Sequence, residues 1–407
     1  MLTPSELQAI IDTMYPLLDG LNAWITKDMI RRIMERIGRG EGLLLTSTDE
    51  WQLEVLQAAG GHLEAVQQQI QKFTKASDAE IARIFEDAGI KALAADSVFY
   101  VGAGLQELSM TDDMVRILTD IYQRTNGTIH NFTRTTAETS QQKLIKILDE
   151  AHMKVMTGAQ SYTGAVKDAV NEIVNSQARV QYPTGHTDTI ETAVLRAVRT
   201  GVAQASGNMA TQGMIERDWD LIRVSAHIGA RYGDGGENPS NHFWWQGKLY
   251  SRTGRTPGYP LFEEATGYGT GEGLSGWNCR HSFGPGDPDH NPYADFDSAE
   301  NKKVYDLSQK QRSYEARIRR TKTKLLGIRE AIDFCTDDAA KATLEEEYAK
   351  NAVLLQKQNA AYNKLCEDNG LKKLGDRISI AKWTRSEAAK ATAAARKKLK
   401  ANADADT

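Results

Sequence analysis

The chain has 407 residues, of which 40% are hydrophobic and 26% charged, and its net charge of -4 points to no particular charged partner. This length suffices for about two or three domains with a sizeable core, while the start of the chain has no signal-peptide pattern and no apolar run of membrane-spanning length. Three cysteines, Cys279, Cys335 and Cys366, are an odd number without framework spacing, which argues against a disulfide scaffold and for a reducing compartment.

The first part of the chain, from residue 4 to about 155, has apolar residues at helical spacings of three and four. Ser47 or Thr48 is a candidate cap for a helix that ends at a pair of glycines, Gly60 and Gly61. The next helix has its own candidate cap, Ser77 or Asp78. We therefore predict a helical N-terminal domain over residues 1–155, built as a bundle or an elongated array.

The helical pattern continues from about 156 to 222, with one long alanine-rich helix that starts at a candidate cap, Thr187 or Asp188. Residues 225–293 differ, because they hold most turn dipeptides and few helical periods. A loop stretch of this length is uncommon in a compact domain unless short strands, a metal or a partner surface pins it. We predict a domain over residues 156–298 that contains this turn-rich module.

From about 299 to 368 two long charged helices follow, separated by the capping sequence TDDAA. They predict an antiparallel helical hairpin over residues 299–370. The sequence as a whole thus predicts a mainly α fold, with a helical N-terminal array, a central turn-rich α+β module with short strands, and a C-terminal hairpin followed by a basic tail.

The tail, residues 371–407, carries ten basic and two acidic residues between positions 371 and 400, a local charge of +8. Such a run is either a solvated helix face or an arm that binds nucleic acid or an acidic protein surface. The candidate DNA- or partner-binding residues are Lys372, Lys373, Arg396, Lys397, Lys398 and Lys400.

The turn-rich module contains His227, His242, Cys279 and His281, which match in number the ligands of a tetrahedral Zn²⁺ site. Cys279 and His281 stand two residues apart and can point to one face of an extended segment. Zinc is therefore a candidate cofactor.

Three other interpretations of these residues stay open. The histidines can hydrogen-bond loop backbone while Trp277 and Cys279 pack a small core, without any ion. Cys279 and His281 can form a catalytic pair, although a base usually comes from a distant segment. Finally, His227 or His242 can activate water beside a bound cation in a nuclease. The glycine-rich stretch GYGTGEGLSG lacks the strand and helix that a phosphate-binding loop requires, and neither HExxH nor GxSxG occurs.

The ordered segments LRAVRTGVAQASGN, DLIRVSAHIGAR, NHFWWQGKLYS and YPLFEEATGYGTGEGLSGWNCRHSFGP resemble the tailed-phage minor capsid protein 2 family, relatives of the head-morphogenesis proteins. The resemblance includes His-x-x-x-Arg at 227–231, Trp-Gln-Gly-Lys at 245–248 and Gly-x-Asn-Cys-Arg-His at 276–281. Arg199-Thr200 also matches a recurrent Arg-Thr of those relatives, whereas His281 stands where relatives carry a second cysteine.

This resemblance implies a virion protein of the phage head, without catalysis, that is associated with the portal and acts in head assembly and DNA packaging or delivery. The implied partners are the portal protein, the major capsid and scaffold proteins and, without sequence preference, DNA, but no membrane. The implied location is the phage head, and the host cytoplasm during assembly. A metal-dependent nuclease acting on phage or host DNA is the alternative.

Overall fold

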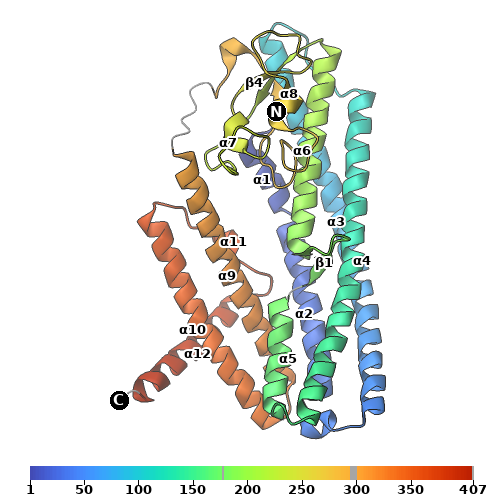
Figure 1. Cartoon of the computed structure of the whole chain (residues 1–407), viewed down its shortest axis with the longest axis vertical. Helices are drawn as coiled ribbons and strands as arrows, with labels where there is room; N and C mark the ends of the chain where they lie inside the picture. Colours follow the sequence, from blue (N-terminus) through green and yellow to red (C-terminus); the bar gives the residue numbers. More distant parts are fainter. Residues whose placement is uncertain (177, 294–299, 406–407) are drawn as a thin grey trace. The chain divides into compact units, whose positions relative to one another are not determined.

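The computed structural model describes residues 1–176, 178–293 and 300–405 (Figure 1). Its long helices are α1 (Pro4–Asp12), α2 (Tyr15–Ile37), α3 (Thr48–Gly102), α4 (Asp112–Met156), α5 (Tyr162–Ser176), α6 (Ile190–Glu216), α9 (Asn301–Phe334), α10 (Asp338–Asp368) and α12 (Arg385–Ala405). Shorter helices are η1 (Glu41–Leu44), α7 (His242–Trp245), α8 (Phe262–Thr266), η2 (Pro288–His290) and α11 (Gly375–Ile378). The strands are β1 (Arg179–Gln181), β2 (Thr187–Thr189), β3 (Leu221–Val224), β4 (Leu249–Ser251) and β5 (Phe283–Pro285). Helices make up 70% of the chain, which confirms the predicted mainly α class with a small α+β portion.

The chain forms two compact units, each assembled from three segments. Unit 1 contains Met1–Tyr15, Thr74–Asn131 and Thr192–Gln309, and unit 2 contains Pro16–Phe73, Phe132–Glu191 and Lys310–Thr407. Several long helices pass from one unit into the other. The four consecutive domains predicted from the sequence stay a prediction, and the boundary expected between residues 298 and 299 lies outside the described residues.

Helix α3 corrects the expectation of two separately capped helices, since it runs without a break from Thr48 to Gly102. At the glycine pair, the Arg32 guanidinium donates to the carbonyls of Ala58 and Gly61, and a Cβ on Gly61 would lie 2.8 Å from Arg32 Nη1. The glycine thus admits a neighbouring side chain instead of ending the helix. Ser77, the expected cap, is buried and its hydroxyl donates to the Thr74 carbonyl one turn earlier.

The start of α6 is also corrected, because the helix begins at Ile190 and not directly after Thr187 or Asp188. Those two residues lie in β2, which pairs with β1 in antiparallel register. The two strands are joined by a tight turn in which the Gly185 backbone N–H donates to the Tyr182 carbonyl. Thr187 and Asp188 therefore pair with β1 instead of capping α6.

The turn-rich module lies in unit 1, where β4, β3 and β5 form a three-stranded antiparallel sheet with β3 in the middle. Apolar side chains of the sheet, of α7 and α8, and of the end of α6 form one buried cluster. Its buried members are Ala210, Met214, Ile222, Val224, Trp245, Tyr250, Phe262, Ala265, Leu274, Cys279 and Phe283. The predicted short strands are thus present, and the module has its own core around Cys279.

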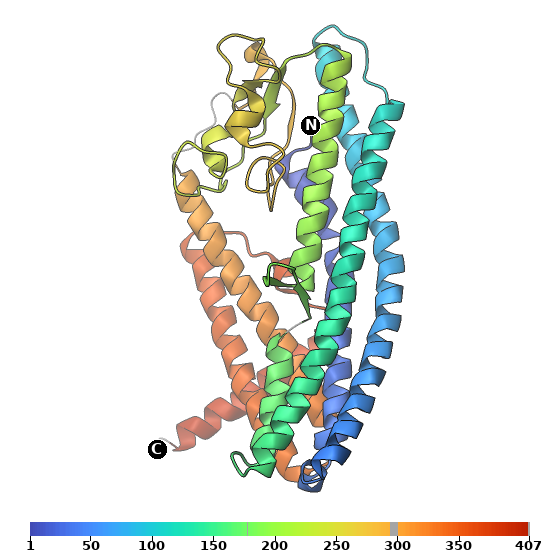
Figure 2. The same ribbon diagram turned by 45° about the vertical axis from the view of Figure 1, so that its right-hand side comes forward.

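In unit 2, α9 and α10 run antiparallel, as both ribbon views show (Figures 1 and 2). Tyr362 of α10 donates to Glu315 of α9 at 3.3 Å, and closer to the connection Lys324 pairs with Glu347 at 3.5 Å. Asp337 caps α10 by accepting from the backbone N–H of Ala340 at 2.8 Å. The predicted hairpin and its TDDAA cap are therefore confirmed. Within the described part of the chain, no helix combines the length and apolarity needed to cross a membrane.

Candidate metal centre

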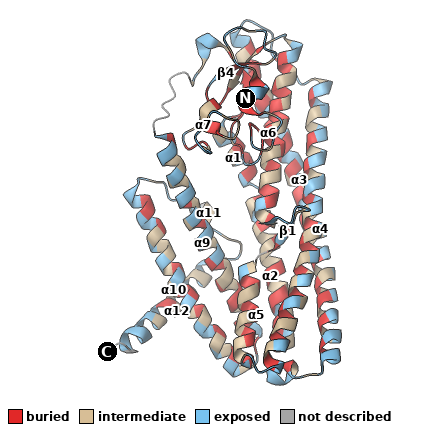
Figure 3. Cartoon of the chain, viewed as in Figure 1, coloured by how far each residue is buried: buried red, intermediate tan, exposed pale blue. Residues whose placement is uncertain are grey.

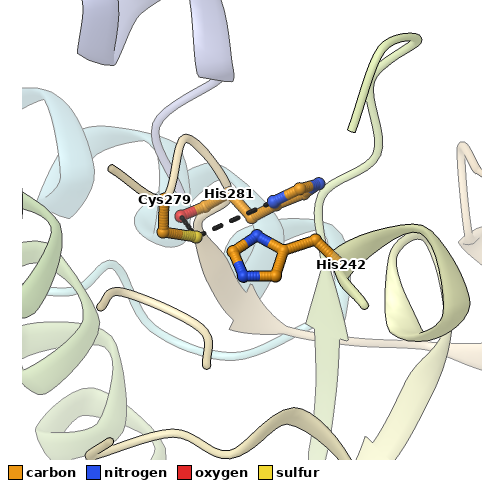
Figure 4. A group of neighbouring side chains, drawn as sticks. All are labelled: His242, Cys279 and His281. Carbon is orange, nitrogen blue, oxygen red and sulfur yellow. Dashed lines mark hydrogen bonds between the residues drawn. The ribbon is translucent and has the colours of Figure 1, made fainter. Parts of the chain in front are cut away.

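Three of the four predicted ligands gather inside the turn-rich module, as Figure 4 shows. His242 begins α7, while Cys279 and His281 lie in the extended segment that leads into β5. One potential ligand atom from each of the three lies within 4.8 Å of the others. All three side chains belong to residues that are at most 2% exposed.

Hydrogen bonds fix which imidazole nitrogen of each histidine is free. Gln246 Oε1 accepts from the backbone N–H of His227 at 3.1 Å, which identifies that atom as the amide oxygen. His281 Nε2 lies 3.0 Å from the same oxygen and must therefore donate, so Nδ1 keeps its lone pair and faces Cys279 Sγ at 3.7 Å. His242 Nε2 likewise donates to the Glu272 carbonyl at 2.9 Å, which leaves its Nδ1 free.

These hydrogen bonds give the pattern expected of metal-ligating histidines, whose second ring nitrogen donates to an oxygen. Zinc bond lengths of about 2.3 Å to sulfur and 2.0–2.1 Å to nitrogen place tetrahedral S and N ligands about 3.6 Å apart. The distance of 3.7 Å from Cys279 to His281 matches this spacing. The donor set of one sulfur and two nitrogens suits zinc chemically.

His227, the fourth predicted ligand, is not a member of this group. Its ring stacks on the ring of His281, with centroids 4.4 Å apart and an interplanar angle of 24°. Its Nδ1 lies 3.1 Å from the Ile228 carbonyl and donates to it. In this position the His227 ring covers one face of the His281 ring and is not itself a ligand.

Burial keeps all three gathered side chains uncharged at neutral pH. It lowers the pKa of His242 to about 3, assisted by the positive charge of Arg231, and it lowers the pKa of His281 well below its usual value. Burial also raises the pKa of the Cys279 thiol. Neutral imidazoles are the metal-binding form, whereas the thiol has to lose its proton when a cation binds.

The glycine-rich stretch before Cys279 positions the cysteine through close backbone contacts. A Cβ on Gly273 would lie 2.2 Å from the Gly267 carbonyl oxygen, and a Cβ on Gly276 would lie 2.4 Å from that of Gly271. The Leu274 backbone N–H donates across the loop to the Thr266 carbonyl at 3.0 Å. The loop can close on itself only because these positions lack side chains.

Arginines from two other segments hold the same loop. Arg231 donates to the carbonyls of Glu272 and Trp277, so it joins both sides of the loop. On α6, the Arg199 side chain donates to Asn278 Oδ1 and Thr200 donates to the Gly276 carbonyl, each at 3.4 Å. The motifs around residues 199, 231, 246 and 279 thus meet at one place.

Part of the metal-free interpretation agrees with the structure and part does not. His242 and His227 do bond to loop carbonyls, and Cys279 does belong to the module's core. Trp277 is 58% exposed and does not pack in this core. The buried tryptophan of the core is Trp245. The error arises because the glycine-closed loop turns residue 277 outward, which its sequence neighbours do not reveal.

Sequence reasoning missed two positioning residues. One is Gln246, which lies in the Trp-Gln-Gly-Lys segment of the family resemblance. The other is Asp220, whose carboxylate accepts from the hydroxyls of Ser251, Thr253 and Thr256 and organises the turn after β4. No local pattern links residue 220 to that turn, because the sheet brings them together.

The basic residues predicted to bind DNA or a partner lie in unit 2 and do not form one cluster. Arg396, Lys397, Lys398 and Lys400 are on α12, whereas Lys372 and Lys373 precede α11. Lys373 pairs with Glu367 at 2.9 Å and Lys398 with Glu346 at 3.6 Å. The remaining residues are exposed.

Comparison with protein families decides the class of the chain. The family model described as phage minor capsid protein 2 matches residues 2–364. The chain belongs to this family. Searches among curated proteins and among solved structures found no match. As a phage minor capsid protein it has a structural role in the virion, and its partners are other components of the phage head.

Proposed function

We propose that this minor capsid protein is associated with the portal and acts in head assembly and in DNA packaging or delivery. The family match over residues 2–364 carries the proposal. The partners are the portal protein together with the major capsid and scaffold proteins. The protein resides in the phage head and, during assembly, in the host cytoplasm.

The state of the candidate metal centre supports a structural role over a catalytic one. His242, Cys279 and His281 are almost wholly buried, and both Nε2 atoms are already engaged with protein oxygens. A nucleic-acid backbone would reach ligand atoms covered in this way only after the module opens. The module is therefore suited to hold a fixed docking surface.

Assembly in the presence and absence of the portal tests the proposal. Heads are produced with both the portal protein and this chain, and in parallel without the portal, and each preparation is analysed by mass spectrometry. We expect the chain in heads that contain the portal and a strong loss from shells that lack it. Equal incorporation would exclude portal association, and absence from both would exclude the virion role of this chain.

We further propose that His242, Cys279 and His281 hold a Zn²⁺ ion. The free Nδ1 atoms, the sulfur and the distance of 3.7 Å between Cys279 Sγ and His281 Nδ1 fit this ion. The ligand atoms of all three residues lie within 4.8 Å of one another, so they have to approach each other by on the order of 1 Å when the ion binds. Bound zinc would add folding free energy to the module. His227 would supply a fourth ligand only if its ring rotated away from the ring of His281.

Metal analysis of the purified chain tests this zinc site. We expect about one equivalent of zinc, its loss in Cys279→Ala, and its retention in Cys366→Ala, a buried free cysteine of unit 2 that serves as the matched control. His227→Ala should keep the metal if three side chains suffice. Metal-free protein whose melting is insensitive to chelator would show that packing alone holds the module.

A metal-dependent nuclease is the second candidate, since three protein ligands leave the open coordination position that catalytic zinc sites have. Purified protein and a His242→Ala variant are incubated with DNA and Mg²⁺, Mn²⁺ or Zn²⁺. Cleavage by the unchanged chain that the variant loses would favour the nuclease. Equal, negligible cleavage by both would remove it.

A further inference from the structure

Helix α12 has a packed face and a solvent-exposed face, and Figure 3 colours much of this helix as exposed. One face packs on α10 through Ala391 and Ala395, which are at most 3% exposed. At about 100° per residue, five basic residues fall within an arc of about 140° on the opposite side. They are Arg385, Lys390, Arg396, Lys397 and Lys400, and all of them are exposed.

Most cations of this basic face have no acidic partner within the part of the chain that the structure describes. Lys390 pairs with Glu387 at 2.7 Å. For Arg385, Arg396, Lys397 and Lys400, no ion pair occurs among the described residues of the chain. Lys398 lies on the other side of the helix, next to Glu346 of α10. The face therefore presents four free cations.

The residues between these cations favour nucleic acid as the ligand. The exposed face between these cations carries the small side chains Ser386, Ala389 and Ala393 and, near the end of the helix, the carboxylate of Asp404. Protein interfaces are enriched in aromatic residues, methionine and arginine and are depleted in lysine, serine and alanine, and of the enriched types this face carries only arginine. A small, basic helix surface instead suits the sugar-phosphate backbone, and an α-helix of 10–12 Å diameter fits a DNA major groove about 12 Å wide.

We propose that the solvent face of α12 binds the phosphate backbone of double-stranded DNA without sequence preference. Arg385, Arg396, Lys397 and Lys400 supply the phosphate contacts, and Lys390 joins them when it leaves Glu387. Contacts to phosphate alone carry no sequence information, so binding should not depend on the base sequence. The inference deepens the proposed role in packaging or delivery, but its test does not depend on the portal.

Binding of the full-length protein to a mixed-sequence duplex, measured by fluorescence anisotropy at several salt concentrations, tests this surface. Four to five phosphate contacts predict a slope of log K against log salt of about -3.6 to -4.5, because each contact contributes about -0.9. A duplex of different sequence should bind equally. Circular dichroism verifies that each variant keeps its helices.

Two variants with the same change in net charge separate the basic face from general electrostatics. Arg396→Gln, Lys397→Gln and Lys400→Gln remove three cations of the face, while Lys372→Gln, Lys373→Gln and Lys398→Gln remove three basic residues outside it. We expect the first triple variant to reduce the magnitude of the slope by about 2.7 and to lower the affinity at 0.1 M salt on the order of 500-fold. The second should stay close to the unchanged chain.

The outcomes decide between the possible ligands of this face. Equal losses in the two triple variants would show that binding follows net charge and not the face, which overturns the proposal. Failure of the unchanged chain to bind DNA at 50 mM salt would also overturn it, and the face would then be a surface for an acidic protein or a solvated one. Portal association can fail in its own assay while DNA binding persists.

Discussion

The replacement of Gln246 by methionine tests whether one buried amide positions the candidate metal centre. Gln246 is 6% exposed, and its Oε1 accepts from the backbone N–H of His227 and from Nε2 of His281. Methionine keeps a similar volume but cannot accept these hydrogen bonds. Among the described residues the Gln246 amide nitrogen has no hydrogen-bond partner, so no further bond with them is lost.

The expected cost follows from the two donors that lose their acceptor. A buried donor without a partner costs about 1–3 kcal/mol, so two of them lower the free energy of unfolding of unit 1 by about 2–6 kcal/mol. For a folding unit of 150–250 residues, in which 1 kcal/mol shifts the melting temperature by about 2–4 °C, this corresponds to a melting temperature lowered by about 4–24 °C. If the site binds zinc, the His281 ring also loses its orientation, and the affinity for the ion should fall about 10–100-fold.

Thermal unfolding followed by tryptophan fluorescence measures this effect, because Trp245 lies 4.8 Å from the His281 ring. Gln212→Met is the matched control, since Gln212 of α6 makes one exposed hydrogen bond, to Glu216. We expect that control to change stability by less than about 0.5 kcal/mol. A Gln246→Met variant that melts like the control would refute the idea that this amide holds both histidine segments.

Three further predictions concern other parts of the fold. Gly273→Ala should destabilise unit 1 by about 2–5 kcal/mol, because its Cβ meets the Gly267 carbonyl, whereas Gly102→Ala, with open space around it, should not; urea unfolding compares them. For Asp220, burial alone would raise the pKa, but hydrogen bonds from Ser251, Thr256 and Thr253 outweigh it and hold the pKa well below its usual range. The ionised Asp220 carboxylate then stabilises the fold fully above about pH 5, and this stabilisation is lost as the pH falls below about 4. The difference in free energy of unfolding between the unchanged chain and Asp220→Asn should therefore decrease from pH 7 to pH 3, and a constant difference would contradict this. His62→Leu should cost unit 2 about 1–3 kcal/mol by breaking the contacts of His62 with Asp28 at 2.7 Å and with Ser140 at 3.2 Å, while Ser140→Ala, which removes only the longer contact, should cost less; urea unfolding compares the two variants, and equal costs would contradict this.

The sequence alone was sufficient for the features that depend on neighbouring residues. Apolar spacing predicted that these segments are helical, the TDDAA cap predicted a new helix where α10 begins, and the density of glycine and proline predicted the turn-rich module. Each of these follows from local backbone preferences and short-range hydrogen bonds. The ordered motifs were also enough to indicate the phage family, which the family model confirms.

Tertiary structure decided where local signals were overruled or silent. The Gly60-Gly61 pair did not end α3, because Arg32 from α2 occupies the space that the glycine leaves and bonds its carbonyl. Among four candidate ligands, packing brought His242, Cys279 and His281 together and left His227 stacked on one of them. The same held for the basic tail, where the contact of α12 with α10 selects the face that carries Arg396, Lys397 and Lys400. These outcomes depend on contacts between residues far apart in the chain, and such contacts leave no periodic pattern in the sequence.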